Sequence, residues 1–209
     1  MIKKLAPVMP DSIYLATVRT IVTTLSKASF NNQWQRWTKR ELGLKRSPMW
    51  ATELYQLTTL LGGLVLLFSL PEPSRAPRIV TTFTGVLAVF RLFEILLFAL
   101  HWVLVDRRPV KEFRRSLVWF GLSLLELGVF ATLALFWFTG GFSGTRWALL
   151  YEMLGAVFNQ SVPTIVGTGG RILVHAVVIE SWIVLLIVIA VAVSGITRRE
   201  LTRDGTARR

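Results

Sequence analysis

The sequence predicts an all-α membrane protein with four transmembrane helices, and three observations support this fold class. Hydrophobic residues make up 53% of the 209 residues, and the apolar ones gather in four long blocks. The charged residues lie mainly between these blocks. Between the third and fourth blocks a shorter apolar run precedes several glycines, which predicts a short re-entrant helix and a glycine-rich loop between helices three and four.

Each of the four blocks is long enough to cross the ~30 Å of hydrocarbon in a bilayer as a helix. Proline, glycine or clustered charge closes each block, as expected where an apolar span ends. The predicted spans are Leu54–Leu70, Val80–Val105, Leu117–Phe138 and Ile172–Ile196. They define a transmembrane domain of residues 51–197, with a basic cytoplasmic segment of residues 1–50 before it and a basic cytoplasmic tail of residues 198–209 after it.

The positions of the basic residues predict the orientation of the chain. Nine Lys and Arg lie in the first 50 residues, five in the Asp106–Arg115 loop and five in the tail, against two in each of the other two loops. Because cytoplasmic flanks carry the excess of Lys and Arg, both termini and the Asp106–Arg115 loop are expected in the cytoplasm. We therefore expect a multi-pass protein of the cell inner membrane, with the lipid bilayer and not nucleic acid as the partner of its positive charge.

Several chemistries are excluded by residue type. Cysteine is absent and histidine occurs only twice, so thiolate nucleophiles and cysteine- or histidine-rich metal sites are not expected. The sequence also lacks a nucleophile, base and orienting group in a recognisable pattern, and it lacks a nucleotide-binding loop. The expectation is a protein that is not an enzyme and carries no metal or other cofactor.

The basic segment of residues 1–50 contains one amphipathic stretch. Asp11 is suited to cap a helix whose apolar positions are interleaved with Arg19 and Lys27. Such a helix suits the headgroup layer, where it would lie flat as an interfacial helix. The alternative is a short helix that packs against neighbouring subunits.

Four charged residues fall inside the predicted spans: Arg91, Glu94, Glu126 and Glu180. A charge at the centre of a bilayer costs at least ~2.5–3.5 kcal/mol, so each should face protein or water and have a partner. One interpretation is structural, with Arg91 pairing with Glu94 and reaching Glu126 to lock helices two and three. The other makes one of these groups a voltage- or proton-responsive element, although a single arginine is too few for a strong voltage sensor.

The segment between the third and fourth spans does not look like an ordinary loop. Trp147–Phe158 is an apolar, helix-compatible run that is too short to cross the bilayer. Pro163–Gly170 follows as a glycine-rich stretch, which we expect to be extended and which leads directly into the fourth span. Non-helical backbone at membrane depth is tolerated only in protein or beside a wet cavity, so this pattern predicts a pore or a binding cavity.

This segment resembles the pore region of the potassium-channel superfamily, in which a pore helix, a filter of the form T-V-G-Y-G and an inner helix follow one another. The matching residues are Thr164, Ile165, Val166, Gly167, Thr168 and Gly169. The resemblance implies that their backbone carbonyls bind monovalent cations near the outer end of a central axis in a homotetramer, potassium being the ion of the family. Ile165 replaces the threonine of the family filter, which implies poor discrimination among monovalent cations. An alternative register aligns Ser161–Thr164 with the segment after the filter and leaves no filter.

Three function classes remain open. The first is a pore-loop cation channel-like integral membrane protein that conducts monovalent cations. The second is a proton-linked transporter, or an accessory subunit of a membrane complex, that uses Arg91, Glu126 and Glu180. The third is a non-conducting membrane scaffold whose basic N-terminal segment binds anionic lipid or a partner protein. The pore-loop pattern favours the channel.

Overall fold

The computed structural model describes residues 13–44, 49–70, 75–104, 113–139, 144–159 and 167–207. Within these ranges the chain forms seven α-helices, one π-helical turn and no strand. The helices in chain order are α1 (Ile13–Lys27), α2 (Phe30–Glu41), α3 (Met49–Ser69), α4 (Arg78–Leu104), α5 (Phe113–Ala134), α6 (Arg146–Asn159) and α7 (Thr168–Ala207). The π-helical turn η1 (Leu135–Thr139) continues α5.

Four of these helices are long and apolar enough to cross a membrane. Their apolar spans are Trp50–Ser69 in α3, Arg78–His101 in α4, Val118–Trp137 in α5 with η1, and Thr168–Ala190 in α7. The predicted all-α fold with four membrane-spanning helices is therefore confirmed. The described chain is that of a multi-pass membrane protein.

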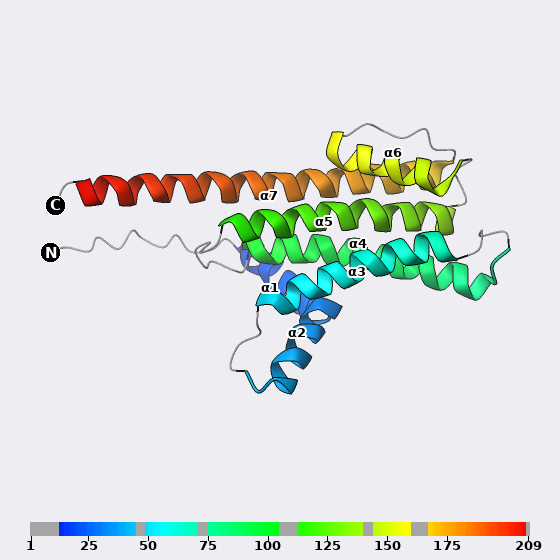
Figure 1. The fold of residues 1–209 in the computed structure, drawn as a ribbon, viewed down its shortest axis with the longest axis horizontal. Helices are drawn as coiled ribbons and strands as arrows, with labels where there is room; N and C mark the ends of the chain where they lie inside the picture. Colours follow the sequence, from blue (N-terminus) through cyan, green and yellow to red (C-terminus); the bar gives the residue numbers. More distant parts are fainter. Residues whose placement is uncertain are drawn as a thin grey trace.

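The end of α7 differs from the sequence prediction. The fourth span was expected to end at Ile196, before the arginines of the tail, whereas the helix continues without a break to Ala207. The charges end the apolar span but not the helix, because arginine and glutamate are good helix formers in water. The last turns of α7 consequently project beyond the other helices of the bundle (Figure 1).

The helix α5 occupies the centre of the bundle. It packs against α3, α4, α6 and α7, and 72% of its apolar span is buried, against 28% for α3 and 33% for α7. The contact with α3 is close at Gly63, where an added Cβ would lie 3.0 Å from a methyl carbon of Val129. The fully buried side chains of Leu127 and Leu133 lie in the same core. A helix surrounded in this way fixes the positions of its polar side chains.

The N-terminal helices attach to one end of the bundle. The helix α1 packs against α4, and α2 packs against α3. In Figure 1, α2 projects sideways from the bundle, across the long axis of the spanning helices. The start of α3, the end of α4 and the projecting end of α7 lie toward this end, while α6 and the start of α7 lie at the other. Basic residues of α1, α2 and the α7 tail therefore gather on one side of the apolar spans.

Candidate functional site

A buried arginine joins three spanning helices at the middle of the bundle. Arg91 of α4 is only 6% exposed. Its Nη2 donates to both carboxyl oxygens of Glu126 on α5, at 2.9 Å to Oε1 and 2.7 Å to Oε2. Its Nη1 donates to Glu94, one helical turn further along α4. The guanidinium group also lies 4.8 Å from the ring centroid of Tyr55 on α3, so all three helices contact the same cation.

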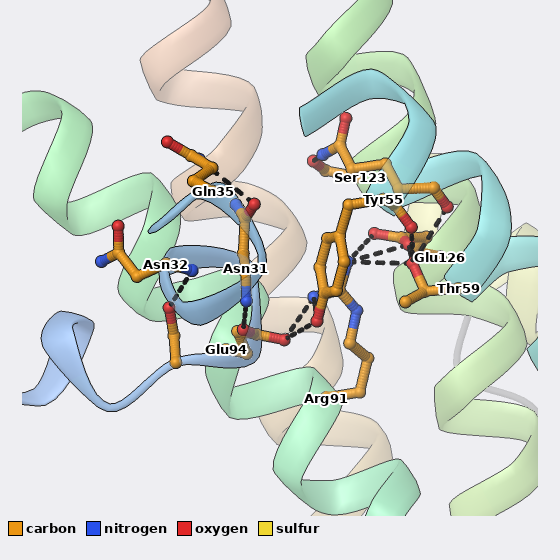
Figure 2. A network of polar contacts seen from close by, with 11 residues as sticks. Asn31, Asn32, Gln35, Tyr55, Thr59, Arg91, Glu94, Ser123 and Glu126 are labelled. Atoms are coloured by element: carbon orange, nitrogen blue, oxygen red, sulfur yellow. Dashed lines mark hydrogen bonds and ion pairs between the residues drawn. The ribbon is translucent and has the colours of Figure 1, made fainter. Parts of the chain in front are cut away.

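The two carboxylates take their remaining hydrogen bonds from α2 and α3. Tyr55 donates its hydroxyl to Glu94 Oε2 at 2.8 Å, and Thr59 donates its hydroxyl to Glu126 Oε1. The backbone N–H of Asn31, the second residue of α2, donates to Glu94 Oε1 at 2.8 Å. Figure 2 shows these groups converging from four helices. Each carboxyl oxygen of Glu94 and Glu126 therefore accepts at least one hydrogen bond. Both residues are buried, with no more than 2% of either exposed.

The first turn of α2 contributes to the charge balance of this network. One arginine faces two carboxylates, which leaves one negative charge without a full counter-charge. The N-terminus of a helix carries a partial positive charge of roughly half an elementary charge. Because α2 directs its first turn at Glu94, its dipole offsets part of the excess. Ser29 caps the same helix end by accepting a hydrogen bond from the Asn32 N–H at 3.2 Å.

Further polar contacts continue from this network toward the α2 end of the bundle. Gln56 of α3 donates to Ser123 of α5 at 3.0 Å, both side chains being buried. Gln35 of α2 donates to Thr52 of α3 at 3.0 Å, next to the bond from Trp34 Nε1 to the Ala51 carbonyl at 2.9 Å. A polar track therefore leads from the basic N-terminal helices to the middle of the spanning bundle.

The predicted pairing of Arg91 with Glu94 and Glu126 is confirmed. Glu180 lies elsewhere, on α7. Its side chain is 8% exposed, and its Oε1 has no hydrogen-bond partner among the described residues. Within the described chain, three of the four intramembrane charges form one network, and no hydrogen bond or ion pair joins Glu180 to it.

The sequence reasoning missed Tyr55, Thr59 and Asn31. Tyr55 and Thr59 are polar residues four apart in the first span, so they lie on one helix face, and this spacing was a usable signal. Asn31 contributes its backbone N–H and not its side chain to Glu94. No residue type encodes that contact.

The short helix predicted over Trp147–Phe158 is present as α6. Its first residue, Arg146, donates to the Leu67 carbonyl near the end of α3 at 2.8 Å, and its guanidinium lies 4.9 Å from the ring centroid of Phe136 in η1. Eight residues later, Leu154 lies over Gly128 in the middle of α5, where an added Cβ would be 2.5 Å from Leu154 Cδ2. The helix α6 therefore runs along α5 from the end of the bundle to its middle.

The six residues that resemble a filter are only partly described. Thr164, Ile165 and Val166 lie outside the described residues. Thr168 and Gly169 form the first turn of α7, which corrects the extended conformation expected there. Gly167 precedes the helix with φ +98°, and its carbonyl accepts a hydrogen bond from the Arg171 N–H at 3.2 Å. The cause is α7, which begins at once after the glycine and uses these carbonyls for its own hydrogen bonds.

No similar protein was found for this chain. Comparisons with protein-family models, with curated proteins and with solved structures return no match.

Proposed function

We propose that the protein is a pore-loop cation channel-like integral membrane protein that conducts monovalent cations, with α6 as its re-entrant helix. The position of α6 carries this proposal. It starts beside the end of α3 and reaches the middle of α5 at Gly128, so it covers about half of the depth of the spanning bundle. A helix that enters halfway must be followed by a segment that leads the chain back to the next span.

The length of that segment limits its conformation. The 14 residues of α6 rise about 21 Å at ~1.5 Å per residue. Residues 160–167 separate Asn159 from Thr168, and eight residues reach at most about 28 Å when fully extended. Because α7 begins at the end of the bundle where α6 also begins, this length is enough to lead the chain back to the next span. Carbonyls of such a segment need ions, water or protein as partners.

The proposed ion-binding carbonyls are those of Thr164, Ile165 and Val166, which lie outside the described residues. The carbonyls of Gly167, Thr168 and Gly169 are less suited to the task, since that of Gly167 is hydrogen-bonded and the other two residues are helical. Ile165 offers no hydroxyl beside the ions. We therefore expect the pore to accept potassium and other monovalent cations with little discrimination.

A homotetramer is the proposed assembly, because one pore loop supplies a quarter of a filter. The exposed apolar side chains of α6 and α7 support contact with neighbouring copies or with lipid. They include Tyr151, Phe158, Ile172, Ile179 and Leu186. The proposed orientation places both termini in the cytoplasm of the cell inner membrane, since the basic residues gather at the α1–α2 end of the bundle.

Thiol block provides the experimental test, because the natural chain has no cysteine. Single cysteines at Ser161 and Thr164 are introduced into the full-length protein, and cation flux into liposomes is measured before and after a charged thiol reagent. The control is Ser69→Cys, at an exposed position at the end of α3. We expect block at Ser161 or Thr164 and none at Ser69. Unchanged flux in all three variants would contradict a pore beside residues 160–166.

A proton-linked function is a second candidate, and one observation favours it. The Glu180 carboxyl is buried in a spanning helix and its Oε1 lacks a hydrogen-bond partner among the described residues. Buried carboxyls in this position mark proton pathways in membrane proteins. If Glu180 carries protons, Glu180→Gln should abolish coupling of transport to a pH gradient. If the protein is a channel, the same variant should still conduct cations when no pH gradient is applied.

A further inference from the structure

Three faces of α2 carry three kinds of side chain. Asn31, Gln35 and Thr38 recur at helical spacing on the face that contacts α3 and α4, where Asn31 and Thr38 are buried. Phe30, Trp34 and Trp37 form an aromatic stripe next to it. The basic stripe of Arg36, Lys39 and Arg40 forms the third face, whose centre lies about 130° from that of the aromatic stripe at 100° per residue. The helix α2 therefore presents a polar face to the bundle, an aromatic face beside it and a basic face on its remaining side.

The aromatic stripe is continuous with an exposed apolar surface of the spanning bundle. Phe30 contacts Phe90 of α4 edge to face, with ring centroids 5.1 Å apart. Phe90 belongs to the apolar span of α4 and remains exposed. Trp37, which packs on Trp34 at 5.2 Å, is exposed as well. Side chains of this kind on a helix that crosses the spanning axis suit the boundary between headgroups and acyl chains.

The orientation of α2 is fixed by bonds at its bundle-facing side. Asn31 donates to Glu94, Trp34 to the Ala51 carbonyl and Gln35 to Thr52. Rotation of the helix would break all three bonds. The basic stripe is therefore held away from the aromatic stripe, and its three side chains are exposed with no ion pair among the described residues.

We propose that Arg36, Lys39 and Arg40 of α2 bind anionic phospholipid headgroups in the leaflet that adjoins this end of the bundle. The membrane is the partner because Phe30, at the start of α2, packs on Phe90 within the apolar span of α4. Trp34 and Gln35, further along α2, bond to the first residues of the α3 span, so the basic stripe that follows them lies at headgroup level. Clustered Lys and Arg on an amphipathic helix attract anionic lipid, each charge contributing roughly a fivefold preference. This site is independent of the proposed pore.

The test measures which lipids contact the protein. Full-length protein is reconstituted into phosphatidylcholine vesicles that contain either spin-labelled phosphatidylglycerol or spin-labelled phosphatidylcholine, and the protein-bound fraction of each label is compared. We expect a preference for phosphatidylglycerol that falls at least about fivefold in the triple variant Arg36→Gln, Lys39→Gln, Arg40→Gln. The matched control replaces Arg75, Arg78 and Arg171, three exposed arginines at the opposite end, and should keep the preference.

Two outcomes would overturn the proposal. If the triple variant keeps the full preference for phosphatidylglycerol, the basic stripe does not bind lipid. An acidic protein would then be the partner to test. If the control loses as much preference as the triple variant, the effect is one of total charge and not of α2. Should the triple variant fail to fold, Lys39→Gln alone should lower the preference by part of the same amount, and an unchanged preference in that variant would equally contradict the site.

Discussion

Arg91 on α4 and Glu126 on α5 meet in a two-pronged ion pair, with Nη2 at 2.9 Å and 2.7 Å from the two carboxyl oxygens. The pair lies in the middle of both helices. The same Nη2 atom also donates to the hydroxyl oxygen of Thr59 on α3 at 3.2 Å. Because insertion of either charge alone is costly, the pair makes the position of α4 on α5 depend on both residues.

The first prediction concerns this pair. Arg91→Met should lower the stability of the folded protein by about 3 to 5 kcal/mol, because Glu94 and Glu126 then lose their cation. The double variant Arg91→Met, Glu126→Gln should lose less than the sum of the two single variants. Thermal unfolding in detergent measures the three losses. Strictly additive losses would show that the two side chains do not stabilise each other.

The second prediction concerns the hydroxyl of Tyr55. Tyr55→Phe removes the hydrogen bond to Glu94 but keeps the ring beneath Arg91. A hydrogen bond to a charged group contributes about 1.5 to 3 kcal/mol, so the variant should unfold at a lower temperature. Tyr151→Phe is the control, since Tyr151 is 81% exposed on α6. Equal unfolding temperatures for the two variants would show that the Tyr55 hydroxyl does not stabilise the protein through Glu94.

The third prediction concerns the contact between α5 and α6. Gly128→Ala places a methyl group against Leu154, which should cost about 1 to 3 kcal/mol and loosen α6. The added substitution Leu154→Ala should recover part of that loss. Gly121→Ala, on the same helix with open space at its Cβ, should be neutral or slightly stabilising. Equal stabilities of Gly128→Ala and Gly121→Ala would place α6 away from the middle of α5.

Local sequence patterns predicted the spanning helices and the short helix α6. The Arg91 pairing was also predictable, because a mid-span cation needs a carboxylate and few are available. The contact from the Asn31 backbone to Glu94 was not, since every residue but proline carries an N–H and only the tertiary arrangement selects one. The start of α7 was misjudged for a similar reason. By their residue type the glycines predict an extended backbone. The apolar helix that follows them nevertheless begins at Thr168, so Thr168 and Gly169 belong to its first turn.

Cation flux into liposomes that contain the purified full-length protein tests the proposed channel most directly. We predict potassium flux well above that of protein-free liposomes. It should fall at least about tenfold in Gly167→Ala, because the φ of +98° there is strained by about 1 to 2 kcal/mol for a residue with a Cβ, and the strain shifts the loop before α7. Gly169→Ala, at a helical position with open space, should conduct normally. A wild-type protein that assembles as a tetramer but shows no flux above protein-free liposomes would contradict the account.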